Sequence, residues 1–270
     1  MKKLLVSSEN AEFQIIESLK TSRSKRSRHN EIFIEGIESI KQVLKSGLEI
    51  TRIITTDKIS SWAHDIIGKI GINNEIKIIE MTETLYAKLC DKNVPSEMLV
   101  TAKMPKLTLS TLKLPEYPFI IVMDRSSDTG NLGSIIRSAN SFGVDAVLLA
   151  GHGVDPWDPK TIRASLGSIF FTVPVQAESM EELAEFVRKF RIKNHLYIWG
   201  TDSLGSVPLN SVTLKRPLML ILGNEAKGIS QSLKSLCDGI LSIPLSGNVN
   251  SLNIAGAAGI FMWEVLKNEN

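Results

Sequence analysis

The sequence predicts an α/β fold in two parts: a larger C-terminal domain built on a parallel sheet, and a small N-terminal α/β unit. From Phe119 onward, short apolar runs alternate with stretches of helical length, which is typical of a parallel sheet covered on both faces. A shorter alternation runs from Glu31 to about Met104. A segment with three prolines separates them, so we expect domains at 1–105 and 118–270 joined by a linker at 106–117.

The elements of the N-terminal unit follow from apolar runs and glycine. Residues 32–34 and 50–55 are rich in isoleucine and predict strands. Between them, Ile40, Val43 and Leu44 lie on one face of a predicted helix that ends at Gly47. Further elements are expected at 62–70, 76–79, 85–89 and 98–102.

The C-terminal domain has a cleaner rhythm. Its predicted strands are 119–123, 146–149, 172–175, 197–200, 218–222 and 240–243. Its predicted helices are 131–142, 160–169, 180–190, 231–237 and 252–266. Ligands of open parallel sheets bind outside the carboxyl ends of the strands, so polar residues that follow these strands are candidates for a site.

Composition places the 270-residue chain among ordinary globular proteins, with 43% hydrophobic and 22% charged residues. No apolar run reaches membrane-spanning length, and the apolar N-terminal stretch meets Ser7 and Ser8 too soon for a signal peptide. The two cysteines, Cys90 and Cys237, lack metal-ligand spacing and are expected to be free thiols. We therefore expect a cytoplasmic protein with no membrane partner.

A basic segment at residues 20–29 is the main charge feature, because the formal net charge of the chain is only +2. Such a cluster can neutralise RNA phosphates, but it is equally compatible with a solvated surface helix or linker. The candidate RNA contacts in it are Arg23, Lys25, Arg26 and Arg28.

The first of three unusual segments, 124–139, passes from an apolar strand through a polar loop into a helix. Asn131 lies about where the helix starts, and Arg137 roughly two turns further along. Both are well placed for a ligand site. The structural alternative makes Asn131 a helix cap and Arg137 a surface ion-pair residue.

The second segment, 223–228, is framed by Gly223 and Gly228 directly after a predicted strand. It superficially resembles a phosphate-binding loop, but Ile229 stands where that motif requires lysine, so we reject a nucleotide-phosphate site. The plain alternative is a tight strand-to-helix turn.

The third segment, 243–253, leads into a helix that begins with small residues. Ser251 or Asn250 is a suitable N-cap for it. Glycine costs helix stability, so the glycines in this helix predict close packing against another backbone or a ligand.

Together these three segments resemble the three motifs of the SpoU (TrmH) family of the SPOUT superfamily. The first match is Asn131, Gly133 and Arg137, and the others are 223–228 and 243–253. Residues 23–102 resemble the ribosomal-protein-like substrate-binding domain of many members, with 33–36 as its opening signature. The resemblance implies a deep trefoil knot in the C-terminal domain, a homodimer formed through it, and S-adenosyl-L-methionine as methyl donor.

The resemblance also implies roles for individual residues. Arg137 would be the central catalytic residue, acting either as a base or by stabilising charge, and Lys160 and Arg163 would contact RNA. The other implied catalytic residues are Asn131, Glu225, Ser251 and Asn253, and the implied donor-binding residues are Leu222, Gly223, Asn224, Ile243 and Leu252. No metal is expected, because the sequence offers no ligand cluster of the right spacing.

The predicted function is therefore methyl transfer to a ribose 2′-hydroxyl of structured RNA, with ribosomal RNA favoured over transfer RNA. Two alternatives stay open: a non-catalytic RNA-binding family member, and methylation of an RNA base. An enzyme that uses a nicotinamide cofactor or a nucleoside triphosphate is set aside, because the chain has neither glycine fingerprint.

Overall fold

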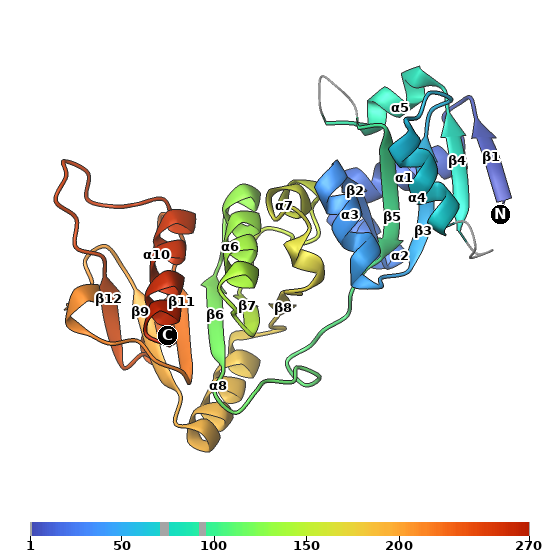
Figure 1. The fold of residues 1–270 in the computed structure, drawn as a ribbon. Coiled ribbons are helices and arrows are strands. Elements are labelled where there is room, and N and C mark those ends of the chain that lie inside the picture. The colour runs from blue at the N-terminus through green and yellow to red at the C-terminus, as the bar shows by residue number, and fades with distance from the viewer. Residues whose placement is uncertain (1, 71–75, 92–95, 270) are drawn as a thin grey trace. The chain divides into compact units, whose positions relative to one another are not determined.

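A computed structural model describes residues 2–70, 76–91 and 96–269, which form two compact units (Figure 1). The smaller unit consists of Met1–Pro105 together with Trp157–Phe170, and the larger unit consists of Lys106–Pro156 together with Phe171–Asn270. Three chain connections therefore join the units, because residues 157–170 leave the larger unit and return to it.

The smaller unit is a five-stranded mixed sheet with helices. Its elements are β1 (Lys2–Val6), α1 (Ala11–Thr21), α2 (Arg23–His29), β2 (Glu31–Glu35), α3 (Ile37–Ser46), β3 (Ile50–Thr55), α4 (Ser61–Ile70), β4 (Lys77–Met81), α5 (Glu83–Leu89), β5 (Met98–Lys103), α7 (Pro159–Ala164) and the 3₁₀ turn η1 (Ser168–Phe170). The strand order is β1-β4-β3-β5-β2. β1 and β3 run parallel to β4, whereas β5 is antiparallel to β3 and β2.

Burial explains the helices on one face of this sheet. Asn10 caps α1 by accepting a hydrogen bond from the backbone N–H of Phe13. Phe13, Ile16 and Leu19 then recur at helical spacing and are fully buried against strand residues such as Phe33. α5 adds its apolar residues to the same core.

The larger unit is built on a seven-stranded sheet in which every pairing is parallel. Its elements are β6 (Phe119–Asp124), α6 (Thr129–Ser141), β7 (Ala146–Ala150), β8 (Val175–Gln176), α8 (Met180–Asn194), β9 (Tyr197–Thr201), β10 (Val207–Pro208), η2 (Leu209–Ser211), β11 (Leu218–Leu222), α9 (Gln231–Lys234), β12 (Gly239–Ser242) and α10 (Ile254–Lys267). The strand order is β10-β12-β9-β11-β6-β7-β8. The predicted α/β class with a parallel C-terminal sheet and a small N-terminal α/β domain is confirmed.

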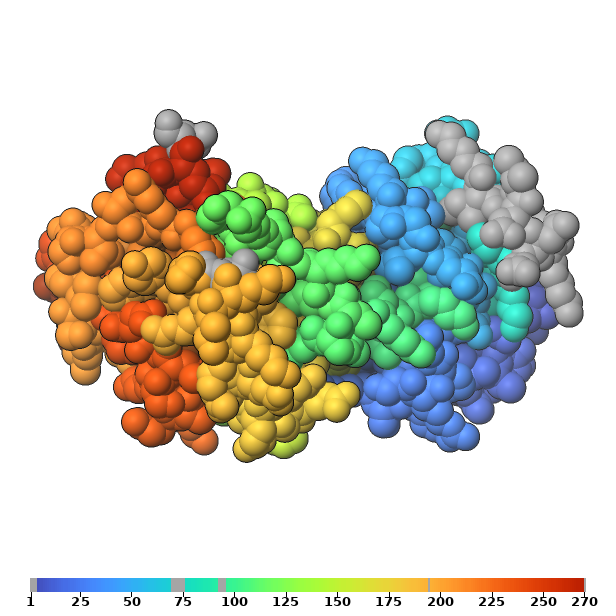
Figure 2. Space-filling model, turned by 90° about the horizontal axis from the view of Figure 1, so that it is seen from below, coloured from blue at the N-terminus to red at the C-terminus, as the bar shows by residue number. Residues whose placement is uncertain are grey.

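Both faces of the larger sheet are covered, which accounts for its uninterrupted apolar strands. β6 and β11 are buried along their whole length. Side chains of α8 and α9 pack on one face, and α6 and α10 pack together on the other, as Figure 1 shows. Leu109, in the segment before β6, also joins the α8 side of the core, and Figure 2 shows this green segment beside the gold α8.

Several elements differ from the sequence-based expectation. β1 and α1 were not predicted, and the strand expected at 172–175 is reduced to Val175–Gln176. The helix expected at 160–169 is a short α7 followed by η1. The prediction that Ser251 or Asn250 caps the last helix is wrong: α10 begins at Ile254, and Asn253 is its N-cap, accepting from the N–H of Ala255.

Candidate active site

The candidate site lies at the carboxyl ends of the central strands of the larger unit. The parallel register places Met123 of β6, Leu222 of β11 and Thr201 of β9 side by side, so the loops that follow them emerge together. The loop between β12 and α10 reaches the same region, because Asn253 contacts the start of α6. This is where open parallel sheets bind ligands.

A chain of hydrogen bonds joins the three sequence motifs. Asn131 at the start of α6 donates through Nδ2 to Oε1 of Glu225 (3.2 Å). Asn253, before α10, donates through Nδ2 to Oδ1 of Asn131 (3.0 Å). Ser127 donates through Oγ to the other carboxylate oxygen of Glu225. The structure therefore brings together three of the predicted catalytic residues and adds a fourth side chain.

The loop that carries Glu225 is closed on itself. The backbone N–H groups of Asn224 and Gly228 each donate to the other residue's carbonyl, at 3.0 and 2.8 Å. A Cβ atom on Gly223 would lie 2.5 Å from the carbonyl carbon of Gly228, so only glycine fits at this position. Oδ1 of Asn224 accepts from the N–H groups of Ala226 and Lys227, both at 3.0 Å.

An ion pair ties this loop to the loop after β6. Arg125, whose φ is +52°, donates through two nitrogens to the buried carboxylate of Asp124 and through Nη2 to the carbonyl of Gly228 (3.0 Å). Asp124 also accepts from the N–H of Ser230 (2.6 Å), and Asn224 donates through Nδ2 to the carbonyl of Arg125 (2.8 Å). These bonds fix the two loops against each other.

Electrostatics keep both carboxylates of the site ionised. Burial raises the pKa of Glu225, but the hydrogen bonds from Ser127 and Asn131 outweigh it and hold that pKa below its usual value. The pKa of Asp124 is likewise lowered: burial opposes ionisation, and the bonds from Arg125 and Ser230 more than compensate. At neutral pH, Glu225 is therefore a hydrogen-bond acceptor.

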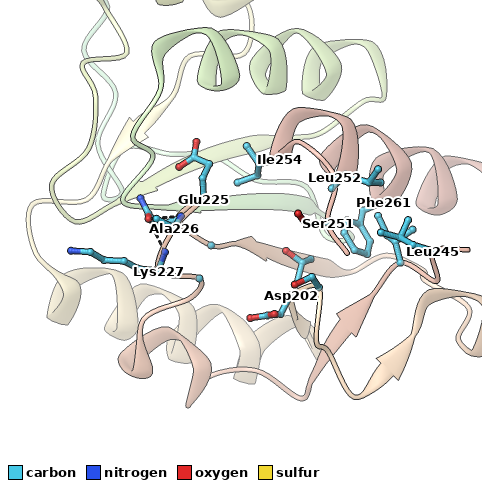
Figure 3. Close-up of a pocket in the computed structure, with 16 residues that line it drawn as sticks. Asp202, Glu225, Ala226, Lys227, Leu245, Ser251, Leu252, Ile254 and Phe261 are labelled. Atoms are coloured by element: carbon cyan, nitrogen blue, oxygen red, sulfur yellow. Dashed lines mark hydrogen bonds between the residues drawn. The ribbon is translucent and has the colours of Figure 1, made fainter. Parts of the chain in front are cut away.

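A cavity of about 380 Å³ opens beside this cluster, within the roughly 300–1,000 Å³ typical of small-molecule sites (Figure 3). Of the predicted donor-binding residues, Gly223, Asn224, Ile243 and Leu252 line it, and the predicted catalytic residues Glu225 and Ser251 do so too. Leu222 is buried in β11 and is not in the wall.

Further wall residues were missed by the sequence reasoning. Leu245 and Phe261 add apolar surface, and Asp202, at the end of β9, adds a carboxylate (Figure 3). In the same view the Lys227 side chain extends away from Ser251 and Phe261. Asp202 could have been found, because it comes two residues after the predicted strand 197–200 of a parallel sheet.

Arg137 lies apart from the cluster. Its position in α6 is six residues beyond Asn131, about 9 Å along the helix axis, and its side chain is exposed. Within the described part of the chain, its guanidinium has no hydrogen-bond or ion-pair partner. The structure therefore leaves it available to a molecule outside the chain.

The predicted RNA-binding residues have two different environments. Arg23, Lys25, Arg28 and Lys160 are exposed. Arg26 is only 2% exposed and donates to the carbonyls of Leu19 and Lys20, at 2.8 and 3.1 Å.

Arg163 resembles Arg26 rather than the exposed cations. It donates to Glu35 at 2.9 Å, and the Glu35 carboxylate is fully buried. A longer ion pair of 3.5 Å joins Arg163 to Asp91. Arg26 and Arg163 therefore serve the interior of the smaller unit in this structure.

Among the described residues, no group of three His, Cys, Asp or Glu side chains is arranged to hold a metal ion. A search of the same residues finds no helix with the length and apolar character that crossing a membrane requires.

A parallel sheet with a cavity and a polar cluster at its carboxyl ends defines an α/β enzyme that binds a small organic molecule. Residues 118–263 match the model of the SpoU rRNA Methylase family, and residues 10–100 match the SpoU L30e-like domain. The chain belongs to the SpoU rRNA Methylase family, which confirms the resemblance of its motifs.

Individual relatives agree with this assignment. The chain is 31% identical to a 23S rRNA (uridine(2479)-2′-O)-methyltransferase of Streptomyces viridochromogenes, over 97% of this chain and 91% of that protein. It is 26% identical to the 23S rRNA (guanosine(2553)-2′-O)-methyltransferase RlmP of Bacillus subtilis, over 90% and 92%. The crystal structure of the SpoU methyltransferase AviRb of Streptomyces viridochromogenes with AdoMet superposes with a TM-score of 0.88 at 31% identity, covering 96% of this chain and 98% of that one.

Proposed function

We propose that this protein transfers a methyl group from S-adenosylmethionine to the 2′-hydroxyl of a ribose in ribosomal RNA. The observation that carries the proposal is the hydrogen-bonded cluster of Asn131, Glu225 and Asn253 beside a cavity of ligand size. The names of the relatives, which act on 23S rRNA, favour ribosomal over transfer RNA.

The cavity suits the donor chemically. Ile243, Leu245, Leu252 and Phe261 offer apolar surface to an adenine ring, and the carboxylate of Asp202 offers attraction to a cationic molecule. When bound, S-adenosylmethionine supplies a methyl group already activated by its sulfonium. Gly223 and Asn224, with these apolar residues, would hold it through backbone groups and packing.

Catalysis then consists mainly of positioning the ribose hydroxyl and accommodating the charge that develops on it. Asn131, held by Glu225 and Asn253, orients the ribose, and Ser251 lines the adjacent cavity together with Glu225. Arg137 is always protonated, so it stabilises the developing negative charge on the 2′-oxygen and binds the adjacent phosphate rather than acting as a base.

RNA binding in this proposal uses the 1–105 domain and the exposed cations Arg23, Lys25, Arg28 and Lys160. The buried Arg26 and the paired Arg163 support the protein that presents these cations.

The catalytic domain is 118–270, with 106–117 as the connecting segment. The chain of this domain would form the trefoil knot of the family. β12 lies between β9 and β10 in the sheet, whereas α10, which follows β12 in sequence, packs against α6, the helix that follows β6.

We also propose a homodimer through α10. Cβ atoms built on Gly256 and Gly259 would meet no atom within 4 Å among the described residues, so the close contact that these glycines predicted is not made within the chain. Trp263 is 53% exposed and Ile260 is exposed on the same helix. Sedimentation should give a dimer, and Trp263→Glu should shift it to monomer; a monomeric wild type would contradict the proposal.

We place the protein in the cytoplasm, where ribosomal RNA is found and the two free thiols would stay reduced.

The test is incubation with methyl-labelled S-adenosylmethionine and unmodified ribosomal or transfer RNA, followed by digestion to nucleosides, with Arg137→Ala as control. We expect label in one 2′-O-methylnucleoside from ribosomal RNA, absent with the variant. Label on a base would replace the proposed reaction with base methylation. Donor binding without transfer to any RNA, including assembled ribosomal particles, would favour the non-catalytic alternative.

A further inference from the structure

We infer that Ser127 is a positioning residue for methyl transfer, because its hydroxyl fixes the Glu225 carboxylate that in turn orients Asn131. The inference rests on the proposed function and names a residue of the segment 124–139 that is not among its motif matches Asn131, Gly133 and Arg137.

Ser127 is held in place from both sides. The carbonyl of Arg125 accepts from Asn224, and the carbonyl of Ser126 accepts from the N–H of Val154 (2.9 Å). On the other side, Asp128 is the N-cap of α6 and accepts from the N–H of Asn131 at 2.7 Å. The Ser127 hydroxyl therefore comes from a backbone that is fixed before any substrate arrives.

Glu225 needs such a partner because no cation fixes it. Within the described part of the chain it forms no ion pair, in contrast to Asp124, which is paired with Arg125. The last torsion of a glutamate side chain is broad, so one hydrogen bond leaves the carboxylate free to turn about that bond. The Ser127 hydroxyl on Oε2 and the Asn131 amide on Oε1 hold the two oxygens separately. They act together with the backbone N–H groups of Ser127 and Glu225, which also lower the pKa of this carboxyl.

The fixed carboxylate sets the direction of the whole chain of bonds. A carboxylate only accepts hydrogen bonds, so Asn131 must turn its amide nitrogen toward Glu225. The side-chain oxygen Oδ1 of Asn131 then faces Asn253 and accepts a hydrogen bond from its Nδ2. Oδ1 of Asn253 in turn accepts from the backbone N–H of Ala255 (2.9 Å). Ser127 is therefore the first donor in an ordered series that ends at α10. If Glu225 turned, the Asn131 amide would lose the partner that determines which of its two ends faces the ribose.

The neighbouring residue provides a matched control. Ser126 is buried, and its hydroxyl has no hydrogen-bond partner among the described residues. Removing that hydroxyl leaves no donor or acceptor unsatisfied, so Ser126→Ala should change little. Ser126→Ala and Ser127→Ala delete the same atom at adjacent positions of one loop.

The experiment measures kcat and KM for unmodified ribosomal RNA, and the Kd for S-adenosylmethionine by calorimetry, in full-length variants with checked melting temperatures. We expect Ser127→Ala to lower kcat about tenfold, as loss of a hydrogen bond to a charged group does, with KM and donor Kd within about twofold of wild type. Ser127→Thr should recover most of kcat, and Ser126→Ala should match wild type. In a Glu225→Ala background, Ser127→Ala should have no further effect on kcat.

Three kinetic or binding results would overturn the inference. They are a Ser127→Ala enzyme as fast as Ser126→Ala, a loss of kcat that multiplies with that of Glu225→Ala, and a donor Kd that weakens as much as kcat falls. A melting temperature lowered equally by Ser127→Ala and Ser127→Thr, with no recovery of kcat, would mean a purely structural role and would also overturn it. Failure of the wild-type protein to methylate RNA would remove the proposed function itself, and this inference with it.

Discussion

In the larger unit, polar side chains from three segments meet at the end of a parallel sheet, whereas in the smaller unit polar side chains form a buried ion pair. Asn131, Glu225 and Asn253 are linked by hydrogen bonds without an ion pair, beside an open cavity. Arg163 and Glu35 form a charged pair in which the carboxylate is fully buried. One cluster is open to a ligand and the other is closed by the protein itself.

This difference between the two units indicates which arginines act in function and which stabilise the fold. Arg137 is exposed and has no partner in the described chain, so its charge is available for RNA and for the reaction. The charge of Arg163 is already used by Glu35, and removing it would leave a buried carboxylate unpaired. Changes in the first region should therefore affect rate, and changes in the second should affect stability.

The largest expected effect is that of Arg137→Ala, which should reduce methyl transfer by about a thousandfold, as removal of a charge-stabilising donor does elsewhere. Its melting temperature should be unchanged, because the Arg137 guanidinium has no hydrogen-bond or ion-pair partner among the described residues. Arg137→Lys should retain part of the activity at an unshifted pH optimum. Complete inactivity of the lysine variant with normal RNA binding would count against charge stabilisation.

Arg163→Ala should instead lower the free energy of unfolding of the smaller unit by about 3 kcal/mol, because it leaves the buried Glu35 carboxylate without its cation. Urea denaturation measures it, and the double variant Arg163→Met with Glu35→Leu should recover much of the loss. If Arg163→Ala weakened RNA binding without changing stability, the division between the two regions would be wrong.

Asp202→Asn tests the donor cavity. Removing a carboxylate from its wall should weaken binding of the cationic S-adenosylmethionine about tenfold, equivalent to roughly 1.4 kcal/mol. S-adenosylhomocysteine, which lacks the sulfonium charge, should be affected less. Calorimetry with both molecules decides, and equal affinities in variant and wild type would show that Asp202 takes no part.

Arg28→Ala and Arg26→Ala separate exposed from buried cations on one helix. Arg28→Ala should weaken RNA binding a few-fold and lower the slope of log affinity against log salt by about one unit, with stability unchanged. Arg26→Ala should chiefly lower stability, because two backbone carbonyls lose their donor. Binding assays at several salt concentrations decide. If Arg26→Ala weakened RNA binding and Arg28→Ala only lowered stability, the roles assigned to these two arginines of α2 would be wrong.

The smallest effect concerns the thiols, one in each unit. Burial, with nearby Glu35 for Cys90 and Asp238 for Cys237, raises the pKa of each to about 11. A raised thiol pKa means that the reactive thiolate is scarce below that pH, roughly one part in a thousand at pH 8. Iodoacetamide should therefore modify the folded protein slowly at pH 8 and faster toward pH 11. Rapid labelling at pH 8 would show that the thiols are less buried.

Periodicity in the sequence predicted the apolar strands β6 and β11. Asn131, Glu225 and Asn253 were expected from the resemblance to the family motifs, and the structure joins them by hydrogen bonds. Arg26 and Arg28 could not be told apart, because residue type alone does not say which face of α2 is buried. Ser127 was missed because it is not one of the matched motif residues, and only the fold brings it to Glu225, 98 positions away along the chain.

The most direct test of the account is a double-mutant cycle between Asn131→Ala and Glu225→Ala, read as single-turnover methyl transfer. If the two side chains work as one hydrogen-bonded unit, each single variant should be slow and the double variant only about threefold slower than the worse single. If the two losses multiply instead, Asn131 and Glu225 act independently, and the account of a joined catalytic cluster is wrong.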